Sequence, residues 1–213
     1  MKHSRAPAPL RNLVIATANP GKLREFQALL TGLPFAPIAQ GALGIATPEE
    51  TGTTFAENAL LKARHAAAAS GAAAIADDSG LEVDALGGAP GIYSARYAGE
   101  GAAHAAAVDA ANNAKLIAAL EGVPFEARRA RYRCALVYLE SPSDPAPLVT
   151  QGVWEGHILE RPRGAGGFGY DPYFWLPELG ATAAELEPER KNCLSHRGTA
   201  LRALRDALAE RVR

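Results

Sequence analysis

The sequence predicts one α/β domain whose two halves could form separate lobes. A short apolar strand pattern at residues 13–16 is followed by a turn and then by a helix predicted over 23–30. A second helix, predicted over 55–70, precedes the apolar residues 74–76, and residues 131–139 and 148–159 read as two consecutive strands. Strands that alternate with helices, followed by a long hairpin, favour the α/β class.

Composition narrows the class of protein further. The chain has 213 residues, a formal net charge of -1 and 48% hydrophobic residues, which is enough for one large domain with a real core. The balanced charge does not suggest a nucleic-acid binder. The two cysteines, Cys134 and Cys193, form no disulfide framework and no metal-binding spacing. We therefore expect a reduced, cytoplasmic setting with no membrane segment, and a flexible extension over residues 1–10.

The first turn of the chain is a candidate anion site. Thr17, Ala18, Asn19, Pro20, Gly21 and Lys22 join the first strand to the first helix. Asn19 suits the N-cap and Pro20 the first helical position, and a helix N-terminus after a strand binds anions. Lys22 opposes the helix dipole there, which would be tolerable beside a phosphate. The alternative is an ordinary capped helix with an exposed lysine.

The second helix has a clear start signal. Thr54 and Glu57 have the spacing of a capping box, and Gly71 is placed to end the helix. Glu57 thus has a structural role, whereas Glu50 lies in the loop ahead of the helix and has none. We interpret Lys62, Arg64 and His65 as the solvated face of this helix.

Residues 74–80, Ala-Ile-Ala-Asp-Asp-Ser-Gly, are the centre of the prediction. The apolar residues indicate the end of a buried strand, and we expect Ser79 and Gly80 to turn the chain. Two carboxylates, Asp77 and Asp78, then lie at a strand end, where α/β sheets bind their ligands. Because Mg²⁺ prefers oxygen ligands and often bridges to phosphate, the pair is a candidate magnesium site. A solvated Asp-Asp turn is the alternative.

Two glycine-rich loops follow. Residues 87–99 contain two tyrosines and an arginine, and a helix is predicted over 102–120. Residues 161–172 place Phe168 between glycines, which suits stacking on a flat ligand, although a simple loop anchor is the alternative. A short strand is predicted over 173–176, helical structure begins near Ala183, and an amphipathic helix is predicted over 201–212.

Six segments in order resemble one family, the inosine/xanthosine triphosphate pyrophosphatases. Its [Ser/Thr]-x-Asn-x-x-Lys signature is similar to residues 17–22. Its other blocks are similar to 50–58, 76–80, 87–96, 166–172 and 195–198. The resemblance spans residue 13 to the C-terminus, and the extension before it is the visible departure. It implies an elongated mixed β-sheet flanked by helices, with an active-site cleft between two lobes, in a single catalytic domain over 11–213.

The resemblance also implies the activity. The family hydrolyses ITP, dITP and XTP to the monophosphate and pyrophosphate, depends on Mg²⁺ and is usually homodimeric. Carried over residue by residue, Glu50 and Asp78 hold the metal, with Asp77 and Glu57 nearby, and Asp78 is the catalytic base. The substrate-binding residues are then Thr17, Ala18, Asn19, Pro20, Gly21, Lys22, Ser79, Phe168, Gly169, Tyr170, Asp171, Lys191, His196 and Arg197.

Selection of the base follows from hydrogen-bond chemistry. Phe168 would stack on any purine, whereas donors from His196 and Arg197 would suit the 6-oxo group of hypoxanthine and xanthine and leave the amino group of adenine unpaired. Two other functions stay open at this point. One is a nucleotide-binding module without catalysis, which leaves the converging carboxylates unexplained. The other is a related pyrophosphatase acting on pyrimidine or modified nucleotides.

Overall fold

The computed structural model describes residues 10–17, 20–99 and 104–211. The predicted flexible extension therefore lies outside the described residues except for Leu10, which is exposed. Ala18 and Asn19 of the predicted anion-binding turn are also outside them. Within the described part of the chain, no helix is both long and apolar enough to cross a membrane.

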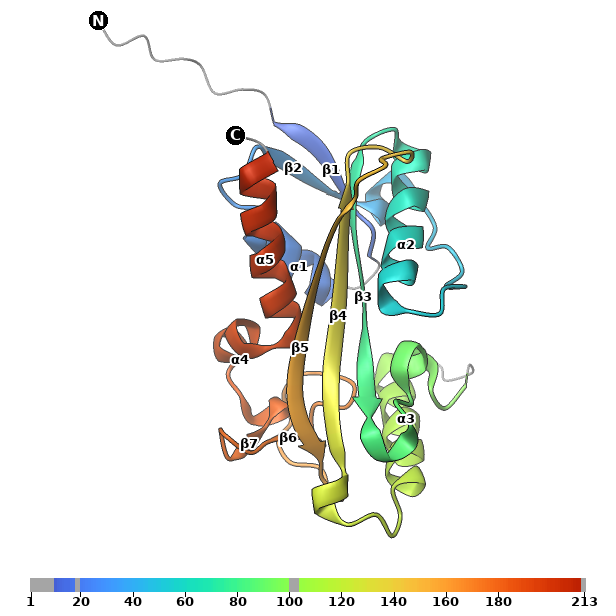
Figure 1. Ribbon diagram of the computed structural model, residues 1–213, viewed down its shortest axis with the longest axis vertical. Helices are drawn as coiled ribbons and strands as arrows, with labels where there is room; N and C mark the ends of the chain where they lie inside the picture. The colour runs from blue at the N-terminus through green and yellow to red at the C-terminus, as the bar shows by residue number, and fades with distance from the viewer. Residues whose placement is uncertain (1–9, 18–19, 100–103, 212–213) are drawn as a thin grey trace, which may run out of the picture.

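A seven-stranded mixed sheet organises the fold, in the order β2-β1-β3-β4-β5-β6-β7. β1 pairs in parallel with both β2 and β3, and every later pair is antiparallel. Figure 1 shows the three longest strands, β3, β4 and β5, running side by side along the long axis of the molecule. The strands are β1 (Arg11–Ile15), β2 (Phe35–Ala39), β3 (Ala73–Val83), β4 (Arg129–Leu139), β5 (Leu148–Ile158), β6 (Phe174–Leu176) and β7 (Ala181–Thr182).

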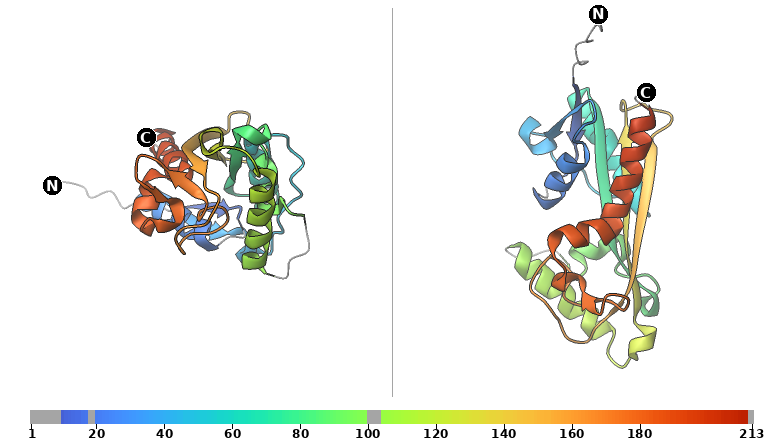
Figure 2. Two further views of the ribbon diagram at one scale, coloured as in Figure 1. Left: turned by 90° about the horizontal axis from the view of Figure 1, so that it is seen from below. Right: turned by 90° about the vertical axis from the view of Figure 1, so that its left-hand side faces the viewer.

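Helices cover both faces of this sheet. Figure 1 shows α2 on the opposite side of the long strands from α5, and Figure 2 shows α5 lying along them. A short 3-10 helix, η3 (Gly91–Arg96), lies within the first glycine-rich segment, residues 87–99. The α-helices are α1 (Pro20–Leu29), α2 (Phe55–Ser70), α3 (Ala105–Ala119), α4 (Pro188–Leu194) and α5 (His196–Arg211).

Three apolar clusters divide the sheet into two halves. In one half, alternate residues of β3 pack on α1 and α5 through Ile75 and on α2 through Ala76. In the other half, Leu81 and Val83 pack with α3 and β4. Since residues of one parity in a strand share a face, α3 lies on the same face of β3 as α1 and α5, in the other lobe. The sheet therefore carries two lobes, as predicted, with residues 77–80 of β3 between them.

The predicted turn at Ser79 and Gly80 is wrong, because β3 continues unbroken to Val83. Ser79 pairs with Cys134 and Gly80 with Arg133 across the antiparallel ladder. Gly80 is required here by close packing: a Cβ atom would clash with the carbonyl oxygen of Gly91 and with Ser94. The glycine allows η3 to approach the strand, and the two aspartates lie in mid-strand, not at a strand end.

Local capping was predicted more accurately than the later helix boundaries. α2 runs over the predicted residues, with both hydrogen bonds of the capping box between Thr54 and Glu57 and with Gly71 in the left-handed region. α5 begins five residues earlier than predicted, at His196. Gly152 on β5 explains this close approach, since a Cβ atom there would clash with the backbone of His196. The first turn of α5 is thus pressed against the sheet, which places His196 and Arg197 at the junction of the lobes.

Candidate active site

Asp77 and Asp78 are adjacent in sequence but point to opposite faces of β3. Ser79 is two residues from Asp77 and so points to the same face of β3, where it borders a pocket with α1 and α5. Asp78 points to the other face and contacts α2. β1 pairs with β3 only as far as Ile75, so β3 has no strand beside it on that edge at the aspartates. Both carboxylates therefore border the opening that follows β1, one from each face.

Asp77 is held by two cations. Its side chain is fully buried, and its Oδ2 lies 2.7 Å from Nζ of Lys22 and 3.6 Å from Nε of Arg197. Burial alone would raise the pKa of this carboxyl, but the charges of Lys22 and Arg197 outweigh it and lower the pKa to about 2. Asp77 therefore stays ionised, and it holds Lys22 at the start of α1, where the phosphate turn was predicted.

Asp78 belongs to a different network, centred on Lys62. Nζ of Lys62 lies 3.0 Å from Oδ1 of Asp78 and 2.8 Å from Oε1 of Glu50, and Arg96 approaches Glu50 at 2.8 Å. Asn58 also donates to Asp78 at 3.2 Å. Burial raises the pKa of Asp78, and the charge of Glu50 adds to the increase. For Lys62, burial lowers the pKa, but the charges of Asp78 and Asp77 outweigh it and raise it.

The prediction for Lys62 as a solvated residue is wrong, whereas Arg64 and His65 are exposed as predicted. Lys62 is buried and joins the two carboxylates proposed as metal ligands. A signal for this was present in the sequence. Residue 62 falls on the helical stripe that Phe55 and Ala59 begin, and this stripe faces the core.

Glu50 and Asp78 could together hold a divalent cation. Both carboxylates already share one ammonium group, which shows that the position between them favours positive charge. Mg²⁺ is commonly bound by one or two carboxylates with substrate phosphates completing its shell, so two are sufficient. Across the described ranges, no group of three or more His, Cys, Asp or Glu side chains gathers as a metal site. Glu57 does not join them, because its carboxylate caps α2 and accepts from Thr53 and Thr54.

A pocket of about 420 Å³ opens between the lobes on the α1 and α5 face. It gathers most of the predicted substrate-binding residues that the structure describes: Lys22, Ser79, Phe168, Gly169, Tyr170, Asp171, Lys191, His196 and Arg197. The ring of Phe168 is 54% exposed, and Nζ of Lys191 lies 5.1 Å from its centroid. An exposed aromatic face at the side of a pocket suits a flat ligand.

The floor of this pocket is a buried polar cluster. Asp171 pairs with Lys191 and accepts a hydrogen bond of 3.3 Å from Tyr132. His196 stacks on Tyr132 with ring centroids 4.8 Å apart. Burial, reinforced by the charges of Arg197 and Lys191, lowers the pKa of His196 well below its usual range. A neutral His196 presents one donor and one acceptor nitrogen to a ligand.

Arg197 lies with the charged residues near Asp77. Its guanidinium group approaches Asp77 and Glu25 at 3.6 Å each and donates to the Ser79 hydroxyl at 3.0 Å. These contacts put it beside Lys22 at one end of the pocket. Its predicted hydrogen bond to a 6-oxo group stays a prediction.

The remaining predicted residues lie in the turn after β1. Thr17 follows the strand, and Pro20 and Gly21 open α1, as the first-position preference of proline predicts. Ala18 and Asn19 fall outside the described residues.

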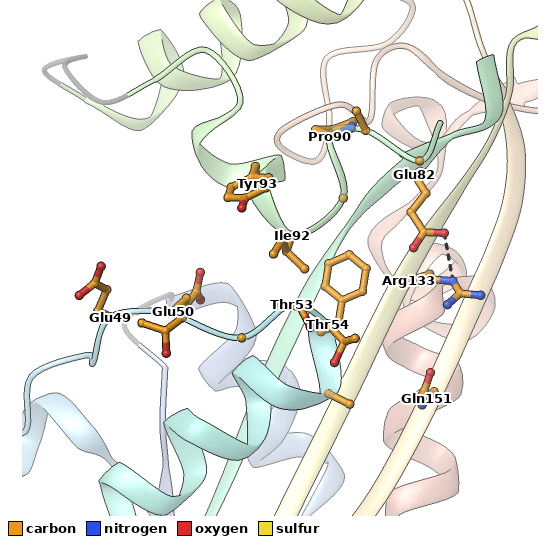
Figure 3. Close-up of a pocket in the computed structure, with 17 residues that line it drawn as sticks. Glu49, Glu50, Thr53, Thr54, Glu82, Pro90, Ile92, Tyr93, Arg133 and Gln151 are labelled. Atoms are coloured by element: carbon orange, nitrogen blue, oxygen red, sulfur yellow. Dashed lines mark ion pairs between the residues drawn. The ribbon is translucent and has the colours of Figure 1, made fainter. Parts of the chain in front are cut away.

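A larger hollow of about 920 Å³ lies on the other face of the sheet (Figure 3). Figure 3 shows the ion pair of Glu82 and Arg133 on one side of it and Glu50 on the other. Of the predicted site residues, Glu50 alone is among its lining. The smaller pocket, with its exposed aromatic ring, therefore suits a flat ligand better, whereas the larger hollow reaches Glu50 from the other face of the sheet.

Comparisons with known proteins agree on one family. The family model described as the Ham1 family matches residues 13–207. A Yersinia pseudotuberculosis protein named dITP/XTP pyrophosphatase is 56% identical over 201 residues, which cover 94% of this chain and 100% of the relative. An Escherichia coli O157:H7 protein of the same name is 55% identical over 199 residues, 93% of this chain and 98% of the relative.

Solved structures give the same result. The structure of a HAM1 protein from Coxiella burnetii superposes with a TM-score of 0.88 at 47% identity and covers 94% of this chain and 100% of that one. The Ham1 protein of Staphylococcus aureus gives a TM-score of 0.83 at 40% identity with the same coverage.

The lowered pKa of Asp77 predicts that the free energy of unfolding decreases in acid. Because the folded pKa of about 2 lies below the ordinary 3.8, the ionised carboxylate stabilises the fold fully above pH 3.8. This contribution, on the order of 2 kcal/mol, is lost as the pH falls towards 2. When urea unfolding is measured between pH 6 and pH 2, the free energy of unfolding should fall less steeply with decreasing pH for Asp77→Asn than for the wild type. Equal slopes would mean that Asp77 is not the group responsible.

Proposed function

Because the chain belongs to the Ham1 family, which hydrolyses deaminated purine nucleoside triphosphates, we infer that its own reaction is the hydrolysis of ITP, dITP and XTP. The products are the nucleoside monophosphate and pyrophosphate, and the reaction removes these nucleotides from the pool. The observation that carries the proposal is that buried cations and carboxylates converge around residues 77–79, at one end of a pocket with an exposed aromatic ring.

The balance of charge around β3 supports a requirement for a divalent cation. Among the residues that the structure describes, ion pairs there match five carboxylates with five cations: Glu25, Glu50, Asp77, Asp78 and Asp171 with Lys22, Lys62, Arg96, Lys191 and Arg197. A cluster that is already neutral has no excess positive charge for a strongly anionic triphosphate. We therefore propose that Mg²⁺ enters with the substrate between Glu50 and Asp78, where it would neutralise phosphate charge and polarise the reacting phosphoryl group.

The residues of the chain then have separate tasks. Lys22 and the turn at residues 17–22 bind the phosphate oxygens at the N-terminus of α1. Asp78 takes the proton of the attacking water. The water oxygen bonds to the α-phosphorus, the bond from that phosphorus to the bridging oxygen breaks, and pyrophosphate leaves. A carboxylate beside a divalent cation stays ionised and is available to accept this proton, which suits the role.

The other end of the pocket binds the base. Phe168 stacks on the purine, and neutral His196, with Lys191 near Asp171, offers hydrogen bonds to its edge. Stacking is tolerant of the base, so discrimination between a 6-oxo and a 6-amino purine falls to the polar groups.

We also propose that the protein acts as a homodimer in the cytoplasm, where nucleoside triphosphates are made and used. Three exposed apolar side chains support an interface on the face of the larger hollow. They are Tyr93 in η3 and Val149 and Val153 in β5. Light scattering should give twice the chain mass of 22.3 kDa. A monomer mass at every micromolar concentration would contradict the dimer.

The reaction is tested by pyrophosphate release from ITP, dITP, XTP, GTP and ATP. The wild type should favour the first three, lose activity in EDTA and regain it with Mg²⁺. Asp78→Asn should lower kcat at least ~1,000-fold with the thermal midpoint nearly unchanged, because it keeps the shape but removes the base and a metal ligand. Full activity in chelator, or turnover near wild type in Asp78→Asn, would contradict the assignment.

Removing Lys62 should make the fold depend on the metal. In Lys62→Met the carboxylates of Glu50 and Asp78 lose their shared cation, so the thermal midpoint in EDTA should fall by several degrees. Saturating Mg²⁺ should then raise the midpoint more than in the wild type, because it fills a vacated position. Arg64→Met is the matched control, since Arg64 lies on the same helix but is exposed. Equal responses to Mg²⁺ in both variants would remove Lys62 from the site.

A further inference from the structure

The loop that carries Phe168 is positioned by its backbone. The ring is 54% exposed, so core packing does not fix its direction. The flanking Gly167 and Gly169 have φ of +72° and +61°, a region that glycine adopts at no steric cost. A ring between two such residues would sample many orientations unless the backbone were held, yet a stacking platform needs one.

The hydrogen bonds that hold this backbone come from two places. Within the loop, Asp171 accepts from the N–H of Phe168 at 2.9 Å. From outside it, Asp109 on α3 accepts from the N–H of Gly169 at 2.8 Å, and Asn113 donates to the C=O of Gly169 at 2.9 Å. Both polar backbone groups of Gly169 are thus bound by one helix.

The two residues of α3 that bond to Gly169 lie on one side of the helix. Asp109 and Asn113 are four residues apart, so they lie one turn apart on the same side of the helix. Further along the same side, Leu116 and the C-cap residue Leu120 supply apolar packing, so the helix is buried by these residues as well as held by the polar pair. Asn113 is nevertheless buried, and the hydrogen bond from its Nδ2 to the C=O of Gly169 offsets part of the cost of burying the amide, whose Oδ1 has no partner among the described residues.

We propose that Asp109 and Asn113 are positioning residues that fix Gly169 and thereby aim Phe168 at the purine. The inference rests on the proposed function, because it takes Phe168 as the residue that stacks on the base. Since the two residues act through a stacking ring, they control affinity for all purines alike. Neither residue was identified as a candidate from the sequence.

A double-mutant cycle with Phe168→Ala tests the proposal. Calorimetric binding of inosine monophosphate in EDTA reports stacking without catalysis, and KM and kcat for dITP with Mg²⁺ report the reaction. Phe168→Ala should weaken binding about 5- to 150-fold. Asn113→Ala and Asp109→Ala should each weaken it ~3- to 30-fold, mainly in KM, with kcat changed by less than about twofold. In the Phe168→Ala background, both losses should shrink below about twofold.

Conservative variants sharpen the test. Asp109→Asn should retain binding, because an amide oxygen can still accept from the N–H of Gly169. Asn113→Asp should not, because a carboxylate cannot donate to the C=O of Gly169. Both changes are nearly isosteric, so neither creates a cavity. Because Asn113→Asp also buries a carboxylate, its thermal midpoint must stay near that of the wild type for the comparison to count.

Asn112 provides the control within the same helix. Its amide holds a different segment, bonding to Ser94, Ala95 and Ala98. Any loss of binding that Asn112→Ala causes should therefore be the same with and without Phe168. If the losses from Asn113→Ala and Asp109→Ala persist as well, they do not act through Phe168 and the proposal is wrong. If Phe168→Ala leaves inosine monophosphate binding unchanged, the proposal also fails, whereas pyrophosphate release by the wild type would still stand.

Discussion

Each of the buried carboxylates of Asp77 and Asp78 must be compensated on its own face of β3, because adjacent residues of a strand point in opposite directions. α1 and α5 supply Lys22 and Arg197 to one face, and α2 supplies Lys62 to the other. Three helices therefore each supply a cation to these two neighbouring residues. The same segment interrupts the apolar core of the sheet, which resumes at Leu81, so the junction between the lobes and the charged centre coincide.

One short element, η3, connects the two ends of the site. Arg96 at its end pairs with Glu50, on the metal side. The C=O of Ser94 accepts hydrogen bonds from Tyr170 and Asn112, on the side of the base pocket. η3 also lies against Gly80, which has no Cβ to keep it away from the strand. One turn thus contacts both Glu50, proposed as a metal ligand, and the loop that carries Phe168, proposed to hold the base.

Features that depend on neighbours in sequence were predictable, and those that depend on distant partners were not. The capping box of α2 and the hairpin of β4 and β5 follow from local patterns, and both are present. Gly80 was misread because glycine is needed both in turns and at close backbone contacts, and only the packing of η3 distinguishes the two. Lys62 was predicted to be solvated because lysine is usually exposed, although its position on the helix faces the core. The carboxylates that make its burial possible lie 12 and 16 residues away, so the sequence near Lys62 does not show them. For Asp109 and Asn113, the sequence carries no signal at all, since their partner is a backbone group 60 and 56 residues away.

The two ends of the pocket are held by different forces, and this difference separates chemistry from recognition. The phosphate end rests on buried ion pairs, where removing one partner leaves an uncompensated charge and disturbs the whole cluster. The loop that carries Phe168 rests on hydrogen bonds to its backbone, of which those to Asp109 and Asp171 are accepted by carboxylates and that from Asn113 is donated by an amide. Each is worth roughly 0.5–3 kcal/mol. Changes around Gly169 can therefore alter the loop that carries Phe168 without altering the ion pairs of Asp77 and Asp78. Changes at Asp77, Asp78 or Lys62 cannot be confined in this way, because each of these residues shares a counter-ion or a strand with the others.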